Sequence, residues 1–224
     1  MIFMNRGIFI AGNESALSRA IESETIRRVE KYAATLIPNR LSGASKNTLP
    51  EVPERMFLDW NPSSPISART LAIAAENRLE RIDEAILICS PPSIRSCAAD
   101  LSLSDVEIMI NDNVKGWFFL VKEIAAIFTA RKHGTLILVY PDITRSGKDE
   151  AADVLGPSAL ASFRALTHGL LTAAGNDQYV TVGFSTSDMG NETSFASFIF
   201  KSLEEVTKKS NGKLHKFGKF NFFK

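Results

Sequence analysis

Residues 7–21 read Gly-Ile-Phe-Ile-Ala-Gly-Asn-Glu-Ser-Ala-Leu-Ser-Arg-Ala-Ile, and this stretch decides the fold. The apolar run 8–11 predicts a strand that is buried on both faces, and Gly12-Asn13 predicts a turn. Ser15 is a good candidate for the N-cap of a helix, because its hydroxyl can accept a hydrogen bond from the first helical turn. Apolar residues at positions 16, 17, 20 and 21 then fall on one side of that helix.

A buried strand, a tight glycine turn and a helix form the arrangement in which a helix N-terminus presents free N–H groups to a pyrophosphate. Gly12 could therefore let the backbone approach a phosphate. An ordinary strand-to-helix turn needs the same glycine, so both interpretations stay open. The stretch predicts the start of a dinucleotide-binding type of fold.

The composition is that of an ordinary globular protein. The chain has 224 residues, of which 45% are hydrophobic and 23% charged, and its net charge of +1 gives no general attraction to nucleic acid or membrane. Its two cysteines, Cys89 and Cys97, do not make a disulfide framework. With no signal peptide visible, they indicate reduced thiols and a cytoplasmic protein. The spacing of the three histidines predicts no metal site.

Short apolar strands alternate with amphipathic helices along the rest of the chain. We expect strands at 33–37, 55–60, 82–89, 135–140, 179–184 and 213–217 after the first one, and helices at 17–32, 66–81, 104–131, 158–174 and 195–208. This alternation predicts a single domain over residues 1–224, a three-layer α/β/α sandwich of Rossmann-like, doubly wound type. Its sheet should be mainly parallel, with about seven strands.

Lysines alternate with phenylalanines at the end of the chain, from Lys208 onward. Basic residues with aromatics could stack on single-stranded nucleic acid. We favour an amphipathic terminal strand whose phenylalanines pack on the core or on a partner subunit, and we expect no nucleic-acid partner. We also expect no membrane contact, because no apolar run approaches the length of about 20 residues that a membrane span needs.

The order and spacing of seven short segments resemble the short-chain dehydrogenase/reductase family over nearly the whole chain. In the first half of the chain, residues 11–20 correspond to the family's glycine-rich turn, 57–59 to the strand ending in an adenine-contacting Asp, and 81–90 to the Asn-Asn-Ala-Gly strand. Residues 112–116 correspond to the Asn-containing helix, and 134–137 to the strand before the catalytic serine. Residues 166–167 correspond to the helix of the catalytic lysine, and 212–218 to the closing strand.

The resemblance implies carbonyl reduction by a tyrosine acid, a lysine four residues later and a serine that holds the substrate oxygen. This chain has Gly156, Leu160 and Pro141 at those positions, so we predict a degenerate member without standard carbonyl reductase activity, in which the cleft serves binding, sensing or assembly. The alternative is an atypical NAD(P)-dependent oxidoreductase that uses a displaced acid. Tyr140 is the candidate acid, because it lies at the carboxyl end of a central strand.

The resemblance also implies where a cofactor, NAD or NADP, would lie. It would contact Gly12, Asn13, Ser15, Leu17, Arg40, Asp59, Cys89 and Ser90. Arg40 could pair with a 2′-phosphate or be a solvated surface residue, and Asp59 could accept from the adenine amine or cap the following turn. Cys89 could be a reactive thiol or a small buried residue. Asn113 is the one residue that remains of the catalytic tetrad, and we favour for it a structural role at a helix kink.

Family members pair through two helices that here span about 104–131 and 158–174. The resemblance therefore implies a homodimer or homotetramer, and the apolar excess of the first helix agrees with this expectation.

Overall fold

The computed structural model of the protein describes residues 6–29, 31–41, 58–94, 96–142 and 153–218. One six-stranded sheet runs through the molecule in the order β2-β1-β3-β4-β5-β6, and every neighbouring pair is parallel. Its strands are β1 (Gly7–Asn13), β2 (Lys31–Ile37), β3 (Glu84–Ile88), β4 (Thr135–Pro141), β5 (Val180–Thr186) and β6 (Lys213–Phe217).

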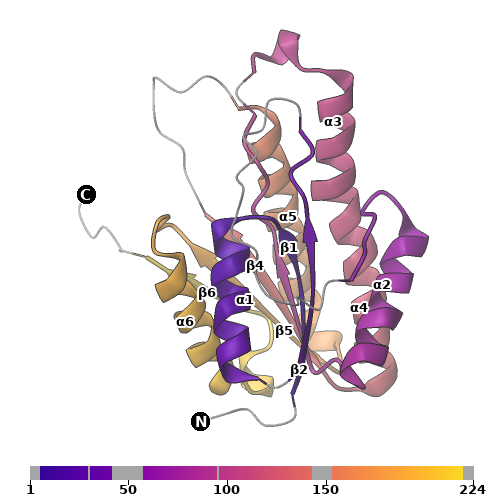
Figure 1. The fold of residues 1–224 in the computed structure, drawn as a ribbon. Helices are drawn as coiled ribbons and strands as arrows, with labels where there is room; N and C mark the ends of the chain where they lie inside the picture. The colour runs from indigo at the N-terminus through magenta and orange to yellow at the C-terminus, as the bar shows by residue number, and fades with distance from the viewer. Residues whose placement is uncertain (1–5, 30, 42–57, 95, 143–152, 219–224) are drawn as a thin grey trace.

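Helices cover both faces of this sheet and make three layers (Figure 1). Helices α1 (Ala16–Arg28) and α6 (Glu192–Glu204) lie side by side on one face. The other face carries α2 (Pro65–Leu79), α4 (Gly116–Arg131) and α5 (Leu155–Ala173), with α3 (Leu103–Ile110) continuing toward the carboxyl ends of the strands. The expected α/β/α sandwich is confirmed.

Strand β1 shows why the sequence forms this arrangement. Its seven residues are all buried, as expected for a parallel strand with helices on both sides. Successive side chains point to opposite faces, so Ile8 and Ile10 pack with α1 and α6, whereas Phe9 and Ala11 pack with α2, α4 and α5. An apolar run without alternation thus supplies both cores at once.

The helix starts are set by local hydrogen bonds. Ser15 caps α1 as expected, since its side chain accepts from the Ser18 backbone N–H. Ser64 caps α2 in the same way and is followed by Pro65, whose ring suits the first helical position. Ser102 caps α3 through the Asp105 N–H.

Several expected boundaries were wrong. Helix α1 ends at Arg28, and Tyr32 instead belongs to β2. Helix α6 ends at Glu204. Of the strand expected at 55–60, residues 55–57 lie outside the described residues. Residues 58–60 do not form a strand, because the only ladder-like bond they make to β2 runs from the Leu58 N–H to the Ala34 carbonyl at 2.8 Å, and a turn follows. In the described part the sheet therefore has six strands, where about seven were expected.

The helix expected at 104–131 is interrupted. A π-helical turn, Asn111–Lys115, separates α3 from α4 and contains Asn113. Such turns are rare and occur frequently at functional sites. This one places the buried side chains of Asp112 and Asn113 at the carboxyl edge of the sheet.

The end of the chain packs as an amphipathic strand in the part that is described. Phe217 of β6 stacks on Phe195 of α6 with the ring centres 5.4 Å apart. The later phenylalanines and lysines of this segment, from residue 219 on, lie outside the described residues.

Candidate functional site

The carboxyl edge of the sheet, where β1 and β3 end, is the place where ligands bind in sheets of this topology. After β1 the chain moves outward to β2 and then returns to β3 on the other side of β1, so the strand order reverses there. Most of the residues expected to contact a cofactor come together at this point.

Gly12, which was expected in a turn, lies near the end of β1 and is tightly packed. A Cβ on Gly12 would lie 2.6 Å from the Ser18 Oγ and 3.3 Å from the Ile88 Cβ, so the glycine is required by contact with this chain's own atoms. Ser15 Oγ accepts from the Ser18 N–H at 3.2 Å, which satisfies one of the free N–H groups that a phosphate would use. Leu17 is buried in the core on the α1 side.

Asn13 forms a bridge across the carboxyl edge. Its Oδ1 accepts a hydrogen bond from the Ser90 backbone N–H at 2.8 Å, and its Nδ2 donates to the Asn113 Oδ1 at 2.7 Å. The first bond fixes the orientation of the amide, because only an oxygen can accept from that N–H. The bridge joins β1, the end of β3 and the π-helical turn, and both asparagines are almost completely buried.

Arg40 makes a second connection across this edge. Its guanidinium pairs with the carboxylate of Asp112 through two hydrogen bonds, at 2.5 and 3.2 Å. Asp112 is buried, so the pair neutralises a carboxylate that would be costly to leave alone. One edge of the Arg40 guanidinium, formed by Nε and Nη2, is thus directed at a protein group, while the side chain stays about half exposed. Neither interpretation made from the sequence anticipated this pair.

The space left between these two connections is small. The crevice lined by Asn13, Glu14, Arg40, Asp112 and Asn113, among others, has a cavity volume of about 10 Å³. One water molecule needs about that much room. Glu14, beside it, pairs with Arg19 at 2.9 Å.

Tyr140 does not point toward this edge. It is 1% exposed and packs edge-on against Phe163 of α5, within the core between the sheet and the α4–α5 layer. Its hydroxyl lies near Ser185 but makes no well-aligned hydrogen bond. Burial raises the pKa of the phenol, and the nearby Asp142 carboxylate adds to the effect. The burial and the raised pKa argue against Tyr140 as the candidate acid, because the alternation along β4 turns its side chain inward.

The first turn of α5 offers no acid either. A Cβ on Gly156 would lie 2.7 Å from an Asp153 carboxylate oxygen and 3.1 Å from the Pro92 carbonyl oxygen. Asp153 accepts from the Gly156 N–H at 2.9 Å and so caps the helix. Leu160, one turn later, packs against the core under α5. Pro141 ends β4.

The remaining predicted residues separate. Ser90 contributes its backbone N–H to the Asn13 bridge, whereas Asp59 is exposed in the segment before α2. Cys89 is completely buried in the core, next to Trp117 of α4, and burial raises the pKa of its thiol well above the usual range. The second alternative for Cys89, a small buried residue, agrees with this position. Cys97 is exposed.

We expect the two thiols to differ sharply in reactivity. Because the thiolate is the nucleophile, the buried Cys89 should be inert toward Ellman's reagent at mildly alkaline pH, and the exposed Cys97 should react. The native protein should therefore release one equivalent of chromophore per chain, and the unfolded protein two. Cys97→Ser should abolish the native reaction. Two equivalents from native protein would contradict the position given to Cys89.

Two classes of site find no support in the described residues. There, no group of three or more His, Cys, Asp or Glu side chains is arranged to hold a metal ion. Of the helices that the structure describes, none is both long and apolar enough to cross a membrane.

Two features of the edge were missed by sequence reasoning, namely the Asn13–Asn113 bond and Asp112 as the partner of Arg40. The partners are 100 and 72 residues apart in sequence. A carboxylate and an amide side by side at 112–113, within an otherwise apolar helix, were the signal that could have pointed to a polar contact there.

Comparison with solved structures identifies the fold. The chain is similar to an NADH-dependent reductase A1-R′ solved with NAD (13% identity, TM-score 0.70, 96% of this chain and 95% of that one). It is also similar to a short-chain dehydrogenase/reductase family oxidoreductase from Brucella ovis, solved with a partially ordered NAD (14% identity, TM-score 0.67, 95% of this chain and 100% of that one). A third similar structure is a short-chain type dehydrogenase/reductase from Mycobacterium marinum, with 12% identity and a TM-score of 0.71, over 96% of this chain and 94% of that one. No family model matches the sequence, and no curated protein matches it.

Proposed function

We propose that this chain, which has the fold of the short-chain dehydrogenases and reductases, is a non-catalytic protein whose role is binding and assembly rather than carbonyl reduction. The observation that carries the proposal is the first turn of α5. There Gly156 lies against the Pro92 carbonyl and the Asp153 carboxylate, so the position has no acid and no room for one.

Reduction of a carbonyl needs a proton donor, because the oxygen must be protonated as it gains charge. Neither Gly156 nor Leu160 can donate a proton or carry a charge, and Pro141 has no side-chain hydrogen-bonding group. The catalytic tyrosine, lysine and serine act together, so replacing all three removes their combined effect, and we expect no residual carbonyl reductase activity.

Tyr140 does not support the alternative, an atypical oxidoreductase. An acid must reach the substrate, and this phenol is buried against Phe163. Its pKa is raised by burial and by Asp142, so the group is a weaker acid than free tyrosine. Position and acidity therefore both argue against a displaced acid at this residue.

We propose that the carboxyl edge does not bind NAD or NADP tightly, although two of the similar proteins were solved with NAD. Among the described residues, the Asn13 bridge and the Arg40–Asp112 pair engage side chains that a cofactor would contact, and the crevice between them holds about 10 Å³. Breaking one buried hydrogen bond without replacing it costs about 1–3 kcal/mol. Such a cost weakens binding by about tenfold to a hundredfold.

Calorimetric titration with NADH and with NADPH tests this part of the proposal. We expect no saturable heat in the micromolar range with either compound. Saturable micromolar binding would show that the cleft is retained, and it would overturn the assignment of these residues to a purely internal role.

Assembly is supported by the outer surfaces of α4 and α5. Apolar side chains of both helices are only partly buried, and Phe118 remains 49% exposed. Small residues alternate with them on α5, and a Cβ on Gly169 would have no atom within 4 Å. A second copy could therefore approach closely. We propose a homodimer through this surface, with the exposed Phe118 in the contact. The outward parts of residues that are half-buried against the core would join it, namely Ala125, Ile127, Leu160, Leu166 and Leu170.

Gly169→Arg should weaken this dimer by about tenfold or more, because it puts a long charged side chain in the contact. Gly175→Arg is the matched control, since Gly175 also has open space around it but lies beyond the end of α5. Sedimentation equilibrium should give a dimer for wild type and for the control, and a shift toward monomer for Gly169→Arg. A monomeric wild type would contradict the proposal.

We further propose that the protein works in the cytosol. Both cysteines are free thiols, and one of them is exposed, which suits a reducing compartment.

A further inference from the structure

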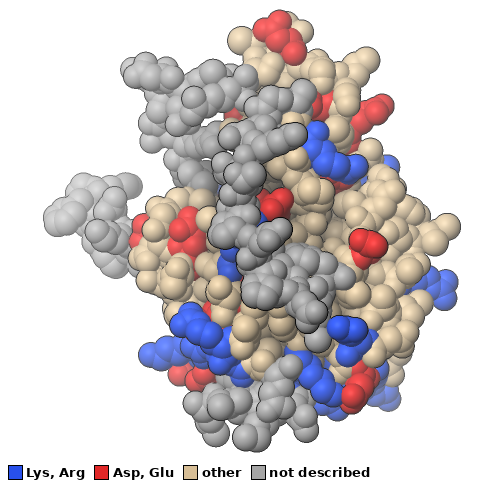
Figure 2. Space-filling model, in the orientation of Figure 1, with Lys and Arg blue, Asp and Glu red and all other residues tan. Residues whose placement is uncertain are grey.

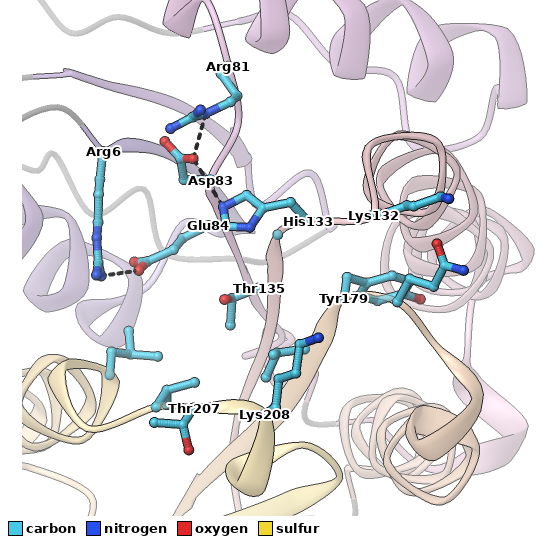
Figure 3. Close-up of a pocket in the computed structure, with 15 residues that line it drawn as sticks. Arg6, Arg81, Asp83, Glu84, Lys132, His133, Thr135, Tyr179, Thr207 and Lys208 are labelled. Carbon is cyan, nitrogen blue, oxygen red and sulfur yellow. Dashed lines mark hydrogen bonds and ion pairs between the residues drawn. The ribbon is translucent and has the colours of Figure 1, made fainter.

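A second cavity lies at the opposite edge of the sheet, where the strands begin (Figure 3). Its volume is about 370 Å³, which falls in the range of small-molecule sites, about 300–1,000 Å³. Its walls come from the starts of β3, β4 and β5 and from the chain that follows α6. We call it the amino-edge pocket, and none of the residues discussed for the carboxyl edge lines it.

The two carboxylates in this pocket are already neutralised. Asp83 pairs with Arg81 at 2.7 Å and accepts from the Gly7 N–H at 3.0 Å. Glu84 pairs with Arg6 at 2.8 Å. Both acids are about 7% exposed, and Figure 3 shows the two pairs together along one wall. Each arginine is therefore committed to a protein carboxylate.

Two lysines in the lining lack such a partner. Within the residues that the structure describes, no carboxylate lies within ion-pair distance of Lys132 or Lys208. Lys208 opens a short 3₁₀ turn, Lys208–Ser210, and its side chain points into the middle of the view in Figure 3. Thr135 and Thr207 also line the pocket, although the Thr207 Oγ1 accepts a hydrogen bond from the Lys209 N–H, and His133 lies 3.7 Å from Asp83. The pocket thus has an excess of positive charge with hydroxyl donors beside it.

The surface around this edge carries charges of both signs. Figure 2 shows Lys and Arg side chains along the lower part of the molecule, the end at which the strands begin in Figure 1, with Asp and Glu side chains among them. Several of these charges are paired, as in Lys31–Glu80 and Arg131–Glu76. The positive excess therefore belongs to the lining of the pocket, and this lining makes an anion the expected ligand.

We propose that the amino-edge pocket binds the phosphate group of a small metabolite, with Lys208 supplying the charge inside the pocket and Lys132, whose side chain points away from Lys208 in Figure 3, adding positive charge at its edge. Lysine binds phosphate as a point charge, and threonine hydroxyls can donate to the oxygens of a tetrahedral anion. A planar carboxylate is bound best by the fork of an arginine, and here both arginines are engaged. The observations therefore favour a phosphate over a carboxylate.

Backbone amide NMR of the full chain tests the proposal with three probes, namely inorganic phosphate, glycerol 3-phosphate and malonate, at ionic strength fixed with sodium chloride. Saturable shifts are expected at residues 132–135 and 207–208 with both phosphates, with malonate binding at least about fivefold more weakly. Tighter binding of glycerol 3-phosphate than of inorganic phosphate would identify a phosphorylated metabolite as the natural ligand.

Lys208→Ala should weaken phosphate binding by about tenfold, which corresponds to the loss of one charge-assisted hydrogen bond. Lys132→Asn should weaken binding less than Lys208→Ala, because its side chain points away from the middle of the pocket in Figure 3. Asparagine tolerates the left-handed backbone at this position, where φ is 56°. Lys209→Ala is the matched control, because this neighbouring lysine does not line the pocket.

Three results would overturn the proposal: shifts that do not saturate, malonate binding as tightly as phosphate, or an equal loss of affinity in the Lys209→Ala control. The proposal does not depend on the absence of reductase activity. Phosphate shifts confined to the Gly12–Leu17 turn would reject the amino-edge pocket while leaving the NADH titration to decide the carboxyl edge separately.

Discussion

Replacing Asn13 with alanine is expected to lower the free energy of unfolding by about 3 kcal/mol. The Asn13 side chain accepts a hydrogen bond from the Ser90 N–H and donates one to the Asn113 Oδ1. The substitution removes both hydrogen bonds and leaves the two partner groups unpaired at a buried position. Each buried polar group left unpaired costs about 1–3 kcal/mol. Chemical denaturation of wild type and variant measures the difference directly.

Asn77→Ala is the control for this variant, because Asn77 is exposed within α2 and its replacement should destabilise the protein by less than about 0.5 kcal/mol. A double-mutant cycle with Asn113→Ala should give a coupling energy of about 0.5–3 kcal/mol. Additive effects of the two substitutions, or an Asn13→Ala variant as stable as wild type, would show that the bridge is not formed in solution.

Rebuilding the missing tyrosine and lysine is the second large perturbation. Gly156→Tyr combined with Leu160→Lys should lower stability by about 3 kcal/mol and give no carbonyl reductase activity. The tyrosine Cβ would lie 2.7 Å from the Asp153 carboxylate and 3.1 Å from the Pro92 carbonyl, so the first turn of α5 must move. The lysine would also replace a leucine that packs on the core. Thermal denaturation and a reductase assay measure the two effects.

A matched pair in the same helix isolates the steric cause. Gly156→Ala should destabilise the protein, whereas Gly169→Ala should be neutral or stabilising by up to about 1 kcal/mol, because its Cβ meets no atom within 4 Å and alanine favours helix. If both alanine variants had the same stability, the crowding at Gly156 would be refuted. Activity in the rebuilt variant would show that the scaffold still accommodates the chemistry.

The fold could be predicted from the sequence because its determinants are local. The run Ile8–Ala11 and the Ser15 cap lie within a few residues of each other, and both are formed as expected. The turn expected at Gly12-Asn13 was wrong, because β1 continues through both residues and the chain bends only at Glu14–Ser15.

Residues 55–60 were expected to add a seventh strand, and their outcome is decided only in part. Residues 55–57 lie outside the described residues, and residues 58–60 make one ladder-like bond to β2. The pattern of apolar residues does not show whether a segment forms a complete set of hydrogen bonds with a neighbouring strand.

The site could be predicted less well because its contacts are distant in sequence. Asn13 and Asn113 meet across 100 residues, and Arg40 reaches Asp112 across 72. Tyr140 was placed at the correct strand end, yet its side chain faces the core, since a shift of one residue along a strand reverses the face. The positions at the carboxyl edge were therefore predictable, whereas the partners and orientations of their side chains were not.

The central claim is that a reductase fold has been retained here without the reductase chemistry. A turnover assay with a panel of aldehydes and ketones, followed by the absorbance of NADH or NADPH, tests it most directly. The claim predicts cofactor oxidation no faster than in the protein-free control for every carbonyl. Enzyme-dependent turnover that Tyr140→Phe abolishes would contradict it and would identify Tyr140 as the acid.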